Sequence, residues 1–184
     1  MKQQRTLVIL VAVLAIVLIA GALQTTLQNR VEVAPTATPI EATYLFNGWG
    51  PNSVFAVNIY EPVAQVGLTI TKNNDNLWEL VEFSGMLTQE EGDVVAGSMA
   101  YFPVLRSLGA LEMNRYNEFG LGQNDLTMIV SVILIDGTEH SIAVGDITAT
   151  TDGFYALVDE DPTLYVVDAR PIAYFTSLLR RAYE

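Results

Sequence analysis

Two runs rich in β-branched residues flank the dipeptide Asp136-Gly137 in the segment LTMIVSVILIDGTEHSIAVGD, and this feature restricts the fold more than any other. An Asp-Gly pair between such runs favours a tight β-hairpin, because it suits the primed turns that join antiparallel strands. The following segment, GFYALVDEDPTLYVVD, repeats the design around a turn at residues 159–162. Together the two segments predict consecutive antiparallel strands.

Three further strands are predicted nearer the N-terminus. Apolar residues alternate with polar ones on both sides of a Glu61-Pro62 break, which is the period of a strand with one buried face. They are Val54, Val57 and Ile59 before the break and Val66, Leu68 and Ile70 after it. A tight KNNDN turn follows, and LWELVEF behind it predicts a third strand that carries Trp78. We expect these three strands to form a meander.

Two helices complete the predicted domain. Apolar residues recur every three or four positions from Val95 to Leu111, which predicts an amphipathic helix with Asp93 as candidate N-cap. Pro103 is expected to kink or split this helix. The segment ARPIAYFTSLLRRAYE predicts a short C-terminal helix with Pro171 in its first turn. The expected fold class is α+β, a mainly antiparallel β-meander sheet packed with these two helices.

The N-terminal region predicts a single transmembrane helix. Lys2 and Arg5 precede an uncharged aliphatic run at residues 6–23, which as a helix spans roughly 27 Å, close to a bilayer core. Positive charge before the run places residues 1–5 in the cytoplasm. A cleaved signal sequence ending at Ala20-Gly21-Ala22 is the alternative. Residues 24–40 then predict an extended linker, and residues 41–184 an exported α+β domain.

Charge and cysteine content exclude several classes of partner and site. The chain has a formal net charge of −12, and residues 41–184 contain twenty acidic and six basic side chains. Such a domain is not expected to bind nucleic acid, and an anionic membrane surface would repel it. The chain has no cysteine, which rules out disulfides and thiolate sites.

The segment VGDITATTDGFYALVDEDP is rich in acidic residues and glycine, and it suggests either a ligand loop or the turns of a meander. A phosphate loop needs glycines between a strand and a helix, whereas both flanks here are predicted strands. A calcium loop of EF-hand type needs a ligand spacing that is missing. Structural turns are therefore expected, with Asp146 and Asp152 as candidates for a weak cation or partner surface.

No catalytic, cofactor-binding or metal-ligating residues are predicted. A Ser-His-Asp triad would have to use His140, the single histidine, which falls on a strand expected to be exposed. The absence of a second histidine argues against a zinc site of the usual type. The acidic pairs Glu90-Glu91 and Asp159-Asp161 could in principle act as glycosidase carboxylates, but both are expected in polar loops, where solvation keeps the pKa of a carboxylate ordinary.

The stretch YLFNGWGPN is the remaining candidate for recognition. Its aromatic residues Tyr44, Phe46 and Trp49 lie among glycines, an arrangement that lines grooves for peptides or sugars in many proteins. The alternative is that Leu45 and Phe46 begin the hydrophobic core. The predicted partner or ligand surface therefore comprises Trp49, Asp146 and Asp152.

The order of these landmarks resembles the domain-of-unknown-function family 4340 of bacterial, usually membrane-anchored proteins. The resemblance rests on YLF at residues 44–46, LWEL, a helix of VLRSLGALEMNR type, FGL at residues 119–121, DGTEHSIAVGD, GFYALVDEDPTLYVV and a final LL helix. It covers nearly the whole chain and implies a membrane anchor with an exported domain. Some members are associated with ABC-type transport or gliding-type membrane machinery, and the resemblance implies no catalytic residues.

Two functional hypotheses follow from the sequence. The preferred one is a non-enzymatic, membrane-tethered module of the cell envelope that contacts envelope or transporter subunits. The alternative is an extracytoplasmic domain that binds a small molecule or a cation. Both place the protein in the cell membrane as a single-pass protein with a cytoplasmic N-terminus and no cofactor.

Overall fold

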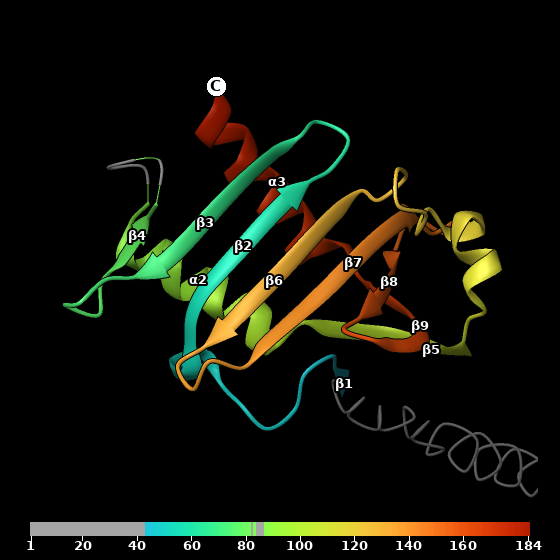
Figure 1. Ribbon diagram of the computed structural model, residues 1–184, viewed down its shortest axis with the longest axis horizontal. Coiled ribbons are helices and arrows are strands. Elements are labelled where there is room, and N and C mark those ends of the chain that lie inside the picture. Colours follow the sequence, from blue (N-terminus) through green and yellow to red (C-terminus); the bar gives the residue numbers. More distant parts are fainter. Residues whose placement is uncertain (1–42, 82, 84–86) are drawn as a thin grey trace, which may run out of the picture. The chain divides into compact units, whose positions relative to one another are not determined.

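A computed structural model describes residues 43–81, 83 and 87–184, which form a nine-stranded sheet with two α-helices. The strands are β1 (Thr43–Tyr44), β2 (Val54–Glu61), β3 (Val66–Lys72), β4 (Trp78–Leu80), β5 (Pro103–Ala110), β6 (Met128–Leu134), β7 (Glu139–Ile147), β8 (Gly153–Val158) and β9 (Asp161–Asp168). Their order in the sheet is β1-β5-β9-β8-β7-β6-β2-β3-β4, and every pair is antiparallel. The predicted α+β class is confirmed (Figure 1).

The predicted tail, membrane anchor and linker, residues 1–5, 6–23 and 24–40, lie outside the described residues, as do the first two residues of the predicted domain. Among the helices that the structure describes, none combines the length and the apolar character that a membrane span requires.

Both predicted meanders are present, and the turn chemistry accounts for most of their geometry. Strands β2, β3 and β4 are consecutive neighbours, and so are β6, β7, β8 and β9. The hairpin predicted at Asp136-Gly137 is present, but the prediction of a primed turn within it is wrong. Gly137 alone has a positive φ, 86°, and its N–H donates to Leu134 O while Leu134 N–H donates to Thr138 O. This is the three-residue hairpin loop that ends in a left-handed glycine.

The helix predicted from Val95 to Leu111 is only half correct. Helix α2 spans Gln89–Ala100, and its N-cap is Thr88 in a capping box with Glu91, not Asp93. The chain then leaves the helix before Pro103 and continues as strand β5. Proline disfavours helical backbone in the preceding residue, and pairing with β9 satisfies the extended segment that follows. The VLRSLGALEMNR segment is therefore strand β5 and the start of the 3-10 helix η2 (Met113–Phe119), not a helix.

The C-terminal helix α3 (Ala169–Tyr183) is as predicted, with Pro171 in its first turn and Asp168 as N-cap. Helices α2 and α3 cover the same face of the sheet (Figure 1). The main core lies between them and the sheet, and it includes Met99, Phe102, Ile172 and Phe175, each at most 1% exposed. A smaller apolar cluster around Leu121, Leu126, Leu157 and Leu164 lies beside η2 residues Tyr116 and Phe119.

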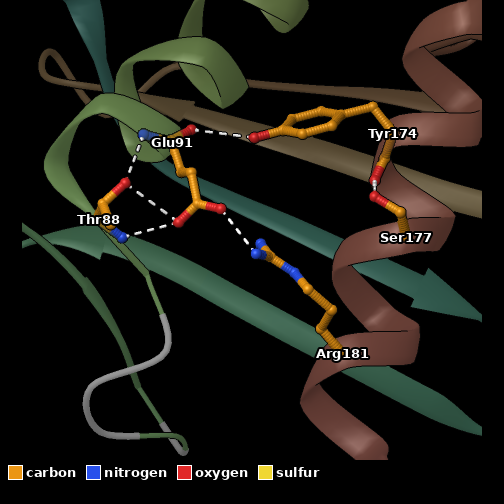
Figure 2. Close-up of polar contacts among 5 residues, drawn as sticks. All are labelled: Thr88, Glu91, Tyr174, Ser177 and Arg181. Atoms are coloured by element: carbon orange, nitrogen blue, oxygen red, sulfur yellow. Dashed lines mark hydrogen bonds and ion pairs between the residues drawn. The ribbon is translucent and has the colours of Figure 1, made fainter.

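A polar bridge joins the two helices. Arg181 Nη1 of α3 lies 2.7 Å from Glu91 Oε1 of α2, and Tyr174 Oη donates to Glu91 O at 3.4 Å (Figure 2). Glu91 also accepts from Thr88 N–H within the capping box, and this bond is the largest single cause that lowers its pKa, followed by the hydrogen bond from Arg181. Glu90 and Glu91 therefore lie in the first turn of α2 and not in the polar loop that was predicted for them. These contacts fix the relative position of the helices.

Candidate functional site

A cavity of about 280 Å³ lies where three segments of the domain meet. Its walls come from the chain after β1 (Leu45, Phe46, Asn47 and Trp49), from His140 of β7, and from the β8–β9 hairpin (Val158, Asp159, Asp161 and Tyr165). The volume is near the lower end of the range for small-molecule sites, about 300–1,000 Å³. Apart from the Trp49 indole, five of its nine lining residues carry a polar side-chain group, so the cavity is more polar than most small-molecule sites, whose walls are mainly apolar and aromatic.

Three rings form the aromatic wall of this cavity. The Trp49 indole stacks on the His140 imidazole with ring centroids 6.0 Å apart and 13° between their planes. Phe46 contacts both, with centroids 5.3 Å from Trp49 and 5.1 Å from His140. Phe46 is 7% exposed and belongs to the core, whereas Trp49 is half-buried against it. The burial of Phe46 therefore agrees with the expectation that this residue begins the hydrophobic core, whereas Trp49 presents its ring to the cavity.

His140 reaches the cavity because of its position in β7. Side chains alternate along a strand, so His140 lies on the same face as Ile142 and Val144, which are buried under the helices. Its side chain is only 24% exposed, so the expectation of an exposed residue is wrong. The imidazole Nδ1 lies 2.9 Å from Asp159 Oδ2, and with a proton on Nδ1 it donates to that carboxylate.

Asp159 shapes the hairpin between β8 and β9 as well as holding His140. Its Oδ1 accepts from Ser141 N–H at 2.7 Å, and its own N–H donates to Ser141 O at 2.9 Å. Asp159 has a φ of 51°, a left-handed conformation that aspartate tolerates better than most residues. The turn is therefore fastened to β7, which fixes the carboxylate and the imidazole relative to each other.

Asp161 supplies the second carboxylate of the cavity. Its Oδ1 accepts from Thr163 N–H at 2.9 Å, and its Oδ2 accepts from Tyr165 Oη at 3.3 Å. The Thr163 N–H bond is the main cause that lowers the pKa of Asp161, so the carboxylate is ionised at neutral pH. Burial, followed by the nearby Asp161 charge, raises the pKa of Tyr165. The wall thus presents a fixed negative charge beside a neutral phenol.

The remaining predicted site residues lie elsewhere. Asp146 and Asp152 are exposed at the end of β8 opposite to the cavity, about 20 Å away along six strand residues. Asp152 accepts from the Thr150 hydroxyl, the largest cause that lowers its pKa, and then from the Thr148 hydroxyl, and it lies 3.5 Å from Arg106. These contacts close the β7–β8 turn. The structure therefore does not bring Trp49, Asp146 and Asp152 together on one surface.

The sequence offered little to find this site. Trp49, His140 and Asp159 come from three separate parts of the chain, so no local pattern links them. In the part of the chain that the structure describes, none of the hydrogen bonds joins a hydroxyl group to His140. Two signals were present: the aromatic stretch YLFNGWGPN, which contributes Trp49, and the β7–β8–β9 meander, whose register places the residue after β8 next to the start of β7.

A second concavity of about 460 Å³ is lined by residues of α2 and its C-cap, of the start of β5 and of the first turns of α3. These residues are Val94, Gly97, Ser98, Tyr101, Pro103, Arg170, Pro171 and Tyr174. Val94 is 47% exposed and Tyr101 52%, while Arg170 already pairs with Asp168 at 2.7 Å. This helix groove is open and mainly apolar, so it offers area for contact with a protein but few groups that would orient a small molecule.

Within residues 43–81, 83 and 87–184, no three acidic or histidine side chains are grouped so that they would hold a metal ion. Comparison of the chain with protein-family models, with curated proteins and with solved structures gives no match.

Proposed function

We propose that this protein is an extracytoplasmic binding module, tethered to the membrane by its N-terminal segment, that takes up a small molecule in the cavity between Trp49 and the β8–β9 hairpin. The observation that carries the proposal is the arrangement of the cavity walls. A stacked Trp49–His140 pair provides apolar surface, and Asp159 and Asp161 are held in fixed positions beside it. Such rigid walls reduce the entropy lost when a ligand binds.

The tether in this proposal rests on the apolar run at residues 6–23 and on the resemblance to the domain-of-unknown-function family 4340. The same resemblance suggests a place beside envelope or transport machinery. A binding site for a soluble ligand, on an exported domain that is tethered to the membrane, would allow the protein to capture a compound outside the membrane. We propose no reaction, because the cavity presents no hydroxyl nucleophile next to the imidazole among the described residues.

Thermal unfolding of the full-length chain in a neutral detergent, with a panel of amines, amino acids, sugars and nucleosides, tests the proposal. A ligand at 100 times its Kd adds about 2.7 kcal/mol to the free energy of unfolding, which raises Tm by roughly 5–10 °C for a domain of this size. The shift should vanish in Trp49→Ala and persist in Tyr60→Ala, an exposed aromatic on β2. A flat panel, or equal shifts in the two variants, would overturn the proposal.

A second candidate function is that of an accessory subunit that docks on a partner protein. The helix groove favours it, because Val94 and Tyr101 expose apolar surface beside it. Full-length protein purified from its native membrane in mild detergent should then retain an envelope or transporter subunit. Val94→Asp should release that subunit, whereas Val63→Asp, in the exposed β2–β3 turn, should not. Retention in both variants, or no stable partner, would contradict this candidate.

A further inference from the structure

The charges around the cavity identify the class of ligand, an inference that rests on the proposed function. We propose that the ligand is an organic ammonium ion, a primary or methylated amine, held against the Trp49 and Tyr165 rings and neutralised by Asp161. The cavity combines the two features that recognise such ions in proteins, aromatic faces and an ionised carboxylate.

The carboxylates of the cavity have no lysine or arginine beside them, and the one basic ring in its lining, His140, contacts Asp159. Two aspartates line the cavity, and the lining contains neither lysine nor arginine. All six basic residues of the described part of the chain have partners elsewhere. The pairs are Arg106 with Asp152, Arg115 with Glu118, Arg170 with Asp168, Arg180 with Glu184, Arg181 with Glu91, and Lys72 with the Trp78 ring. A ligand with a positive charge would complement this site, and an anion would be repelled.

The two carboxylates have different roles. Asp159 directs one oxygen to His140 and the other to Ser141 N–H, so the protein itself occupies both oxygens. Asp161 accepts one bond from Thr163 N–H and a long one, 3.3 Å, from Tyr165 Oη. An ionised carboxylate has about four acceptor positions, so both aspartates keep unused ones. They differ in how tightly the protein holds them, because the contacts of Asp159 measure 2.9 and 2.7 Å whereas Asp161 Oδ2 has only the 3.3 Å contact with Tyr165 Oη. Asp161 is therefore the counter-ion for the ligand, and Asp159 is the residue that positions His140.

The aromatic wall distinguishes an organic cation from a metal ion. Calcium requires about 6–8 oxygen ligands, which two aspartates and apolar rings do not supply. Ring faces instead attract ammonium groups through the negative centre of the π system, most strongly for tryptophan. His140 and Phe46 hold the Trp49 indole in place, so this surface is in position before a ligand arrives.

Isothermal titration of the full-length chain in a neutral detergent, with three probes of matching shape, tests this assignment. The probes are choline, its uncharged isostere 3,3-dimethylbutan-1-ol and the anion 3,3-dimethylbutanoate. We expect choline to bind at least tenfold more tightly than the neutral isostere, and the anion not to bind. Asp161→Asn, which keeps an acceptor for Thr163 N–H, should weaken choline binding about tenfold.

Three further variants separate the ring faces, the counter-ion and general surface charge. Trp49→Ala should abolish choline binding, and Tyr165→Phe, which keeps the ring, should change the Kd less than threefold. Asp75→Asn removes one charge from an exposed turn outside the cavity and should leave the Kd unchanged.

The outcomes that contradict the assignment differ from those that contradict the pocket itself. Equal binding of the neutral isostere and choline, both lost in Trp49→Ala, would overturn the cationic ligand and keep the pocket. Equal weakening in Asp161→Asn and Asp75→Asn would overturn the role of Asp161. Binding of none of the three probes would also overturn the ammonium class, whereas the wider thermal panel decides on the pocket independently.

Discussion

Arg181 Nη1 in the last turns of α3 lies 2.7 Å from Glu91 Oε1 in the first turn of α2, so one carboxylate both caps a helix and links two helices. The Glu91 side chain is 26% exposed, and that of Arg181 is 49% exposed. Exposed ion pairs contribute only about 0–1 kcal/mol, while a helix N-cap contributes about 1 kcal/mol. The capping box is therefore the larger part of what Glu91 provides.

Replacement of Glu91 and of Arg181 should show that the capping box contributes more to stability than the ion pair. We expect Glu91→Ala to lower the free energy of unfolding by about 1–2 kcal/mol, because it removes both the capping bond and the ion pair. Arg181→Ala should cost about 0.5 kcal/mol. Urea unfolding measures both, with Arg180→Ala as the control, since Arg180 lies 4.0 Å from Glu184 at the end of its own helix. Equal losses at Glu91 and Arg181 would show that the ion pair dominates.

Replacement of two glycines of α2 by alanine should change the stability of the domain in opposite directions. A Cβ at Gly92 would overlap the buried Trp78 indole, whereas a Cβ at Gly97 meets no atom within 4 Å. Overpacking typically costs about 1–3 kcal/mol, so Gly92→Ala should be destabilising by at least that amount. Gly97→Ala should stabilise the domain by about 0.5–1 kcal/mol through helix propensity. Thermal unfolding of both variants measures these changes in stability. If Gly92→Ala were as stable as the wild type, the Trp78 indole would have to be able to move.

The β8–β9 turn should depend on both the side chain and the backbone of Asp159. Asp159→Ala loses the bonds to Ser141 N–H and His140 and also places alanine at a φ of 51°. We expect a loss of about 2 kcal/mol. Asp159→Gly removes the same bonds without backbone strain and should cost less. Chemical unfolding measures the free energy of unfolding of the two variants. If Asp159→Gly were no more stable than Asp159→Ala, backbone strain at this position would not contribute to the loss.

The N-cap of α3 should make stability depend on pH. The Arg170 side chain, followed by its backbone N–H, holds the pKa of Asp168 below its usual value. A lowered folded-state pKa contributes stability that is present above the unfolded value, about 3.9, and is lost as the pH falls through the folded value. Asparagine caps a helix about as well as aspartate, so Asp168→Asn loses only the contribution of the charge, about 0.5–1 kcal/mol at pH 7 and progressively less at lower pH.

Urea unfolding of wild type and Asp168→Asn between pH 7 and pH 2 measures that difference. Arg170→Gln, which removes the largest cause of the lowered pKa, is the control and should reduce the pH dependence. A difference between wild type and Asp168→Asn that does not change with pH would contradict the prediction.

The sequence predicted those elements whose determinants are local. The Asp136-Gly137 and residue 159–162 turns, the alternation around Glu61-Pro62 and the Pro171 start of α3 each depend on a few neighbouring residues. The class of sheet followed from these turns, because short turns join antiparallel strands. The type of the hairpin loop was wrong, since Asp-Gly fits more than one loop length.

The segment after Pro103 shows why a period alone was insufficient. Leu105 and Leu108 are spaced as in a helix, yet they are 41% and 52% exposed on strand β5. Their helical spacing therefore does not correspond to a buried face. The conformation of this segment follows from the pairing of β5 with β9, which lies more than fifty residues later in the chain. Tertiary pairing overrides local preference in such a segment.

The sequence by itself determined the antiparallel sheet class, most turns and the acidic character of the domain, because turn chemistry and net charge are properties of the residues themselves. Only the tertiary structure decided that Trp49 stacks on His140, that Asp159 holds that imidazole, and that Asp161 lines the same cavity. Of these residues, Trp49 and Asp161 lie furthest apart in the sequence, by 112 positions. Their geometry follows from strand register and core packing, which no local pattern contains.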